Sequence, residues 1–261
     1  MLPRPNVETW RELLTFISGQ LKPKLTFSVH PTDLMKTDIP SPLALQYERD
    51  GFVTVPNLLG PAECDKLKIE ARRVLDEHAD PGSSVYLHVA VHSPIFKRLS
   101  EDPRLVDILR QILPKGVMFL SDKIVYKAAE QTSPTPWHVD YFYWLQTRPK
   151  LSIWIPLDDV TAENGTLTVI PGSHKKTWPM EKNESGYFSA RIRDADWNAD
   201  DIVSCDLKCG GAIFFSDRLV HGSTTNSAGS DRYVIISTYH APAADEPFDL
   251  KFPARKVLIA S

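Results

Sequence analysis

The feature that most restricts the fold of this sequence is a change of pattern near Val117. After this residue, short segments rich in β-branched and aromatic residues alternate with turn sequences, which is typical of short β-strands. Turn dipeptides stand at Asn164-Gly165, Pro171-Gly172 and Gly210-Gly211. Many short strands predict a β-sandwich or a barrel. The segments expected to be strands are 117–126, 151–157, 166–170, 212–215 and 232–239.

The part of the chain before Val117 has helical patterns instead. A helix can begin at Ser41-Pro42 and end at Asp50-Gly51, and Gly60-Pro61 opens a clearer one because proline suits the first helical turn. A third candidate begins near Pro103, and residues 1–20 resemble a short amphipathic helix. In the second helix, the apolar positions follow the three-and-four spacing of a buried face; they are Cys64, Leu67, Ala71, Val74 and Leu75.

These patterns predict a mainly β protein with flanking helices. The expected architecture is a double-stranded β-helix (a cupin-like jelly roll) with the N-terminal helices packed outside it. No repeat or linker divides the chain, so residues 1–261 are expected to form a single domain, with a helical lead-in over about 1–115 and a jelly-roll core over about 116–245. The polar segment 180–201 is expected to be a long insertion between strands, of the kind that often covers an active site.

Composition and charge exclude several classes of function. The 261 residues are 42% hydrophobic and 24% charged with a net charge of −3, so a sizeable core is possible and no nucleic-acid footprint or polybasic membrane patch is indicated. No stretch approaches 18 apolar residues, and the N-terminus lacks the apolar core of a signal peptide. Three cysteines without a CxxC pair make disulfides unexpected and indicate a cytoplasmic protein.

The run Trp137-His138-Val139-Asp140 carries the strongest chemical signal. On a β-strand, the side chains of His138 and Asp140 would lie on the same face. A second histidine, His221, follows the apolar segment 212–215 and can complete the set. Two histidines and one carboxylate on one face, with the opposite positions open, are the ligands of a non-heme Fe(II) oxygenase.

Arg232 strengthens this interpretation. It begins an apolar segment eleven residues after His221, so a hairpin return would place its guanidinium beside the metal. A buried, unpaired charge is costly, whereas a guanidinium can hold a carboxylate through two parallel hydrogen bonds. The alternative is a structural salt bridge from Arg232 to an internal acid such as Asp231 or Asp217.

Taken together, these motifs resemble the phytanoyl-CoA dioxygenase family of Fe(II)- and 2-oxoglutarate-dependent oxygenases. The similarity runs from about Tyr47 to Ala241. It includes Ser93-Pro94-Ile95-Phe96-Lys97 in the helical part. The other matching motifs, in order, are Trp137-His138-Val139-Asp140, residues 153–159, residues 163–167, Pro171-Gly172-Ser173-His174, and His221-Gly222-Ser223 with Arg232.

The resemblance implies a role for each motif residue. It implies iron ligands at His138, Asp140 and His221, and it implies that Arg232 and Ser223 hold the distal carboxylate of 2-oxoglutarate. Trp154 and Lys123 match positions that border this cosubstrate. The sequence departs from the family pattern in two places: family members often have methionine where Lys123 stands, and Ser84, Val85 and Tyr86 replace an expected basic residue. His174, His88, His92 and His240 are expected to be structural.

The predicted activity is the Fe(II)-, 2-oxoglutarate- and O₂-dependent oxidation of a C–H bond in a small, largely apolar organic substrate. Asp140 occupies the position that halogenases of this class leave without a carboxylate, so hydroxylation is favoured over chlorination. Tyr141, Phe142, Tyr143 and Trp144 are candidates for lining a substrate pocket. The alternatives are a metal-binding jelly roll without redox turnover and a zinc hydrolase with the same three ligands.

Overall fold

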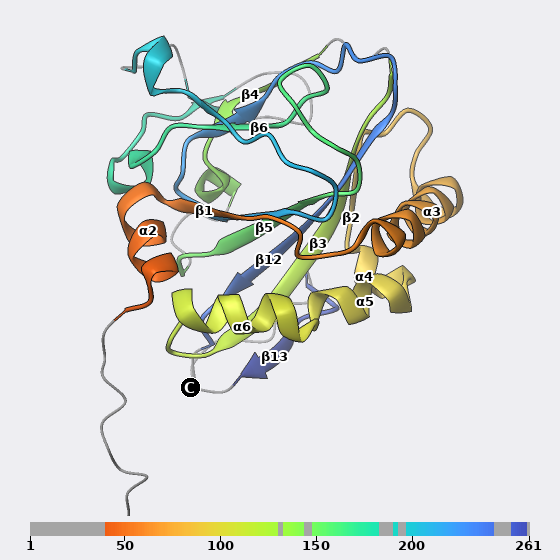
Figure 1. Ribbon diagram of the computed structural model, residues 1–261, viewed down its shortest axis with the longest axis horizontal. Helices are drawn as coiled ribbons and strands as arrows, with labels where there is room; N and C mark the ends of the chain where they lie inside the picture. The colour runs from red at the N-terminus through yellow and green to blue at the C-terminus, as the bar shows by residue number, and fades with distance from the viewer. Residues whose placement is uncertain are drawn as a thin grey trace, which may run out of the picture. The chain divides into compact units, whose positions relative to one another are not determined.

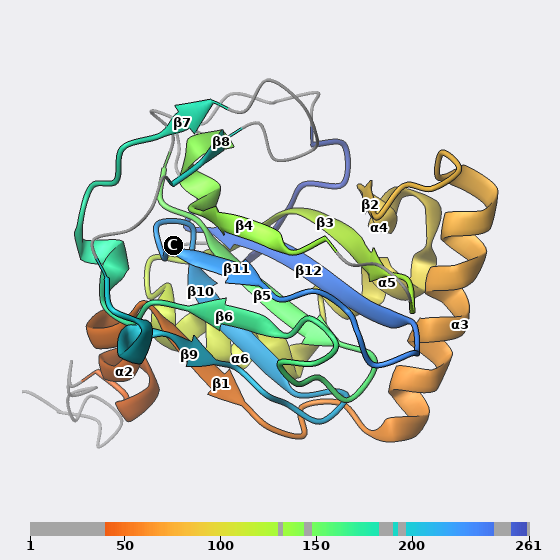
Figure 2. The same ribbon diagram turned by 90° about the horizontal axis from the view of Figure 1, so that it is seen from above.

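A computed structural model describes residues 40–129, 133–143, 148–182, 190–192, 197–242 and 252–259. Two antiparallel sheets make up most of it (Figures 1 and 2). The expected helix over residues 1–20 lies outside the described residues. The major sheet has the strand order β1-β10-β5-β12-β3-β13, with β2 paired to β3, and the minor sheet has the order β4-β11-β6-β9. Each strand that the sequence predicts is present.

The major sheet contains seven strands, and the minor sheet contains four. The strands of the major sheet are β1 (Phe52–Val55), β2 (Val85–Leu87), β3 (Val117–Lys127), β5 (Leu151–Pro156), β10 (Ala212–Ser216), β12 (Arg232–His240) and β13 (Lys256–Ile259). The strands of the minor sheet are β4 (Thr135–His138), β6 (Leu167–Val169), β9 (Val203–Ser204) and β11 (His221–Ser223). Strands β7 (Glu181–Lys182) and β8 (Ala190–Arg191) pair within the expected insertion.

Alternation along the strands of the major sheet separates two cores. On β12, Tyr233 and Ile235 point toward the helices, whereas Val234 and Ile236 point toward the minor sheet. Successive side chains of a strand face opposite sides, so Arg232 shares the inner face with Val234 and Ile236. The inner core lies between the two sheets and includes Leu167 from β6. This packing confirms the predicted jelly roll.

The helices pack on the outer face of the major sheet, and α4, α5 and α6 lie below it in Figure 1. Helices α2, α3 and α6 begin at prolines, as predicted, whereas the short helix α4 begins at Val89. The Ser41 hydroxyl caps α2, and the Asp102 carboxylate caps α6. No helix in the described ranges is both long and apolar enough to cross a membrane. The helices are α2 (Pro42–Asp50), α3 (Pro61–His78), α4 (Val89–His92), α5 (Pro94–Ser100) and α6 (Pro103–Ile112).

Two parts of the predicted organisation differ or stay open. Strands β1 and β2 lie within the segment that the sequence predicts to be helical. They were not predicted because short strands at a sheet edge give little periodic signal in the sequence. The single domain over residues 1–261, divided near residue 116, stays a prediction. All three cysteines are free thiols, as expected.

Candidate metal centre and cosubstrate pocket

His138 and His221 meet because two strands of the minor sheet pair at these residues. His138 ends β4 and lies directly opposite His221, the first residue of β11. Their ring centroids are 4.2 Å apart. A Cβ atom at Gly222 would lie 2.9 Å from the Thr135 carbonyl oxygen, so glycine is the residue that permits β4 to come this close.

Asp140 joins the two histidines from a different element than expected. The strand ends at His138, and Asp140 is the first residue of a 3-10 turn, η2 (Asp140–Tyr143). The prediction of one strand through both residues is therefore wrong, yet the carboxylate still faces the imidazoles. Its Oδ1 atom lies 3.7 Å from the His138 Nε2 and 3.9 Å from the His221 Nε2. One ligand atom from each residue lies within 4.8 Å of the other two.

Main-chain carbonyls orient both imidazoles. The Nδ1 of His138 lies 2.8 Å from the Pro136 carbonyl oxygen, and the Nδ1 of His221 lies 2.9 Å from that of Leu219. Each Nδ1–H therefore donates to the backbone, and this leaves Nε2 as the electron-pair donor that faces Asp140. Burial and the neighbouring His221 lower the pKa of His138 to about 3, and burial also lowers the pKa of His221. Both imidazoles are neutral, as metal ligands must be.

Asp140 stays ionised although it is buried. Burial alone would raise its pKa, but the positive charge of Lys123 and a hydrogen bond from Ser152 help to hold the pKa below its ordinary value. The three residues are 4–5% exposed. Two neutral nitrogen donors and one carboxylate, oriented before binding and screened from water, fit Fe(II).

Arg232 lies at the inner face of β12 and is 1% exposed. Its Nη2 donates to the Gly165 carbonyl over 2.9 Å, its Nε donates to that of Asn164 over 3.4 Å, and its Nη1 is buried with no partner among the described residues. Burial lowers its pKa to about 10, and only the charge of Asp158 opposes this effect. The alternative of a salt bridge to Asp231 or Asp217 finds no support, since no ion pair with Arg232 occurs within the described ranges. A buried guanidinium with an unused donor fits a carboxylate ligand.

All seven residues that the sequence singled out line one cavity of about 60 Å³. Trp154 lies near Arg232, whose guanidinium carbon is 5.7 Å from the centre of the Trp154 ring, and Ser223 lines the same cavity. Lys123 lies close enough to Asp140 to influence its pKa. The remaining wall is mostly apolar: Val85, Val125, Thr135, Leu167, Phe215, Gly222 and Ile236. Of the residues that stand where a basic residue was expected, Val85 lines the cavity and presents an apolar side chain.

The other histidines and the aromatic run lie elsewhere. The His174 Nε2 lies 3.2 Å from the Glu48 carbonyl oxygen, and His240 is buried beside Ala241. Tyr141 and Phe142 pack against an outer cluster with Trp137 and do not line the cavity of the triad. Tyr143 is exposed, and Trp144 lies outside the described residues.

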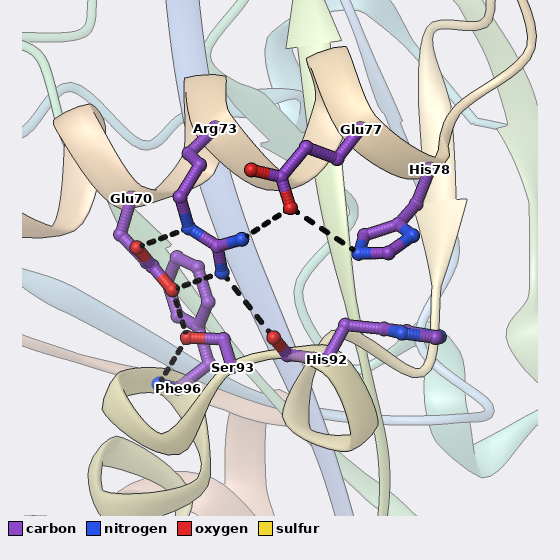
Figure 3. Close-up of polar contacts among 7 residues, drawn as sticks. All are labelled: Glu70, Arg73, Glu77, His78, His92, Ser93 and Phe96. Atoms are coloured by element: carbon purple, nitrogen blue, oxygen red, sulfur yellow. Dashed lines mark hydrogen bonds and ion pairs between the residues drawn. The ribbon is translucent and has the colours of Figure 1, made fainter.

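His92 belongs to a polar network that joins the helices (Figure 3). Its ring packs against that of His78 with centroids 4.2 Å apart and the ring planes tilted by 35°, and its carbonyl accepts a hydrogen bond from Arg73. Arg73 also pairs with Glu70, whose carboxylate accepts a 2.6 Å bond from Ser93 at the start of α5. The network fixes α5 against α3 and has no part in the cavity. His88 likewise contacts the Ser121 hydroxyl, away from the triad.

Comparison with known proteins agrees with this geometry. Residues 47–234 match the family model described as phytanoyl-CoA dioxygenase (PhyH). The chain belongs to the phytanoyl-CoA dioxygenase family. It is 28% identical over 226 residues to an ectoine dioxygenase of Bordetella bronchiseptica, with 75% of this chain and 73% of that protein covered. It is 27% identical over 234 residues to an L-proline trans-4-hydroxylase of Streptomyces griseoviridis, with 75% and 84% covered.

Solved structures of similar proteins extend the agreement to the fold. The crystal structure of EctD from S. alaskensis with 2-oxoglutarate and 5-hydroxyectoine superimposes with a TM-score of 0.65 at 25% identity, over 79% of this chain and 78% of that one. The epimerase SnoN in complex with Fe³⁺, α-ketoglutarate and nogalamycin RO has a TM-score of 0.64 at 24% identity, over 79% of this chain and 91% of that one. The predicted family, the jelly-roll fold and the predicted enzyme class, a dioxygenase of the iron- and 2-oxoglutarate-dependent group, are confirmed.

Proposed function

We propose that this protein is an Fe(II)- and 2-oxoglutarate-dependent dioxygenase that hydroxylates, or otherwise oxidises, a C–H bond of a small organic molecule. The observation that carries the proposal is that a buried two-histidine, one-carboxylate set and an incompletely bonded guanidinium line the same cavity. The relatives named above act on ectoine and L-proline, and the substrate here is proposed to be of similar small size. That it is largely apolar, and that the enzyme is cytoplasmic, stay predictions.

His138, Asp140 and His221 are the residues that would hold the iron. Arg232 and Ser223 would bind the distal carboxylate of 2-oxoglutarate, and the ring of Trp154 would limit its movement. When bound, iron and 2-oxoglutarate together activate O₂ for insertion of one oxygen atom into a C–H bond, with release of succinate and CO₂. The carboxylate of Asp140 occupies a ligand position that a chloride would need, which favours hydroxylation.

The chain's own residues contribute orientation and charge. The Pro136 and Leu219 carbonyls hold both imidazole rings with Nε2 toward the centre, so no reorientation is needed on metal binding. Lys123 supports the ionised state of Asp140. The apolar side chains of Val125, Leu167 and Ile236 line the cavity and would exclude water from a bound cosubstrate, which would strengthen each polar contact there.

Succinate formation tests the proposal. Protein purified without oxygen should bind Fe(II), and incubation with 2-oxoglutarate and a metabolite library that includes ectoine and L-proline should release succinate together with a hydroxylated product. N-oxalylglycine should inhibit this reaction. Asp140→Ala serves as the matched control, because it removes one ligand and leaves the cosubstrate residues in place. If no library compound raises succinate release above that of the control variant, the proposal is wrong.

A further inference from the structure

A second buried cation, Lys127, lies beside Arg232. It is the last residue of β3 and pairs directly with Arg232 on β12. Opposite residues of paired strands project to the same side, so the ammonium lies on the inner face, and its residue is only 3% exposed. Its Nζ donates to the carbonyl oxygen of Thr224 and, over 3.4 Å, to that of Ser133. This burial is unusual, because lysine side chains usually project into water.

The contacts of Lys127 reach the backbone segments that form the cosubstrate pocket. Thr224 directly follows Ser223, and Ser133 leads into β4, where Thr135 lines the cavity. The side chain also packs on Gly165, whose carbonyl accepts the Nη2 bond of Arg232. Gly165 has φ +82°, and a Cβ there would lie 2.9 Å from the Lys127 Cδ. One lysine therefore holds three segments that converge on the pocket.

The charges around Lys127 favour the binding of an anion nearby. In the part of the chain that the structure describes, no carboxylate pairs with its ammonium, and the charge that acts on it most is the repulsive one of Arg232. Burial and this repulsion lower the pKa of Lys127 to about 7. Two adjacent buried cations, one with an unused donor atom, are complementary to a ligand carboxylate.

We propose that Lys127 is a positioning residue for 2-oxoglutarate: it fixes the backbone around Ser223 and Gly165 and adds a second positive charge behind the Arg232 guanidinium. This inference rests on the proposed function. Lys127 does not line the cavity, so it acts through the backbone and through its field. It should therefore affect cosubstrates that carry a distal carboxylate and should not affect those that lack one.

The test compares 2-oxoglutarate with 2-oxopentanoate, which has the same chain length but no distal carboxylate. The affinity of each acid is measured from the rise in melting temperature in the presence of Mn²⁺, so neither turnover nor the primary substrate is needed. Lys127→Met should weaken 2-oxoglutarate binding about tenfold or more and leave 2-oxopentanoate binding within about twofold. Where turnover is measurable, KM for 2-oxoglutarate should rise and kcat should change little.

Lys150→Met is the matched control, because Lys150 is also buried and its ammonium also donates to a main-chain carbonyl, that of Arg148. This control should leave the affinities of both acids unchanged. Lys127→Gln keeps a donor without the charge and carries the test if the Met variant does not fold. Equal losses for both acids, or an unchanged affinity for 2-oxoglutarate, would refute the proposal.

The remaining outcomes are also decisive. Failure of both Lys127 variants to fold would make this lysine a determinant of the fold, which equally refutes the proposal. If the wild-type protein binds neither acid with any metal, the proposed function itself fails. Binding of 2-oxoglutarate by the wild type, with no specific effect of Lys127, overturns only the present inference.

Discussion

Replacing Arg232 by methionine should change stability and cosubstrate binding in unequal amounts. In the protein without ligands, the substitution removes the hydrogen bonds to the Gly165 and Asn164 carbonyls, and a well-formed bond from a charged donor contributes about 1.5–3 kcal/mol. It also removes a buried cation without a carboxylate partner, and such a cation costs several kcal/mol to bury. These terms oppose each other, so the free energy of unfolding should fall by no more than about 1 kcal/mol and can rise.

Binding of 2-oxoglutarate should fall much further. Two charge-assisted hydrogen bonds to a carboxylate contribute about 1.5–3 kcal/mol each. A loss of roughly 3 kcal/mol corresponds to a weakening of Kd by about 150-fold. Urea denaturation of the ligand-free protein gives the first quantity, and a thermal-shift titration with Mn²⁺ gives the second.

A surface arginine provides the control for Arg232→Met. Arg104 forms ion pairs with Glu63 and Asp102, and its side chain is 42% exposed. Arg104→Met should cost up to about 1 kcal/mol of stability and leave 2-oxoglutarate binding unchanged. Our reasoning is refuted if Arg232→Met destabilises the ligand-free protein by more than about 3 kcal/mol while it retains normal affinity, because the guanidinium would then serve the fold.

Three further predictions concern the triad, a buried acid and the helix network. His138→Ala should abolish succinate formation and iron binding with little change in circular dichroism; near-normal activity would exclude it as a ligand. Burial raises the pKa of Asp122 to about 6, and its Oδ2 has no partner in the described ranges, whereas its Oδ1 accepts from the Ala90 N–H. As pH rises from about 4 to 6, the Asp122 carboxyl ionises in the unfolded chain before it does so in the folded protein, so above this range the group destabilises the fold. Asp122→Asn should therefore raise the melting temperature at pH 7.5 but not at pH 4. Equal effects at both pH values would contradict the assignment. Ser93→Ala removes the cap of α5 and the bond to Glu70 and should lower urea stability by about 1–2 kcal/mol without changing 2-oxoglutarate affinity; a neutral result would show that the network does not hold α5.

The sequence predicted those features that depend on local pattern. The run of β-branched and aromatic residues in the segment 232–239 is local information, and it predicted the strand β12, on which Arg232 shares the inner face with Val234. The pairing of His138 with His221 is not local, so spacing alone could only suggest it; the resemblance to a family supplied the rest. The turn at Asp140 was missed because a strand and a 3-10 turn can both bring a carboxylate toward a preceding histidine.

Lys127 shows why the amino-acid sequence alone does not reveal every residue for which a functional role is proposed. Lys123, Val125 and Lys127 alternate on β3, and this pattern could have suggested that all three face inward. Whether an end-of-strand lysine is buried depends on a distant turn, here at Gly165, and on the carbonyl of Thr224. These partners are brought together by the tertiary structure, so the residues next to Lys127 in the sequence do not indicate them.

The carbonyls that hold the two imidazole rings have a consequence for how this protein can change. Because Pro136 and Leu219 contribute peptide oxygens and not side chains, replacing their side chains leaves the hydrogen-bond acceptors in place. Variation in the surrounding residues can therefore reshape the space beside the centre while the ring orientation persists. Substitutions around the site could therefore change which substrates fit, while the orientation of His138 and His221 stays the same.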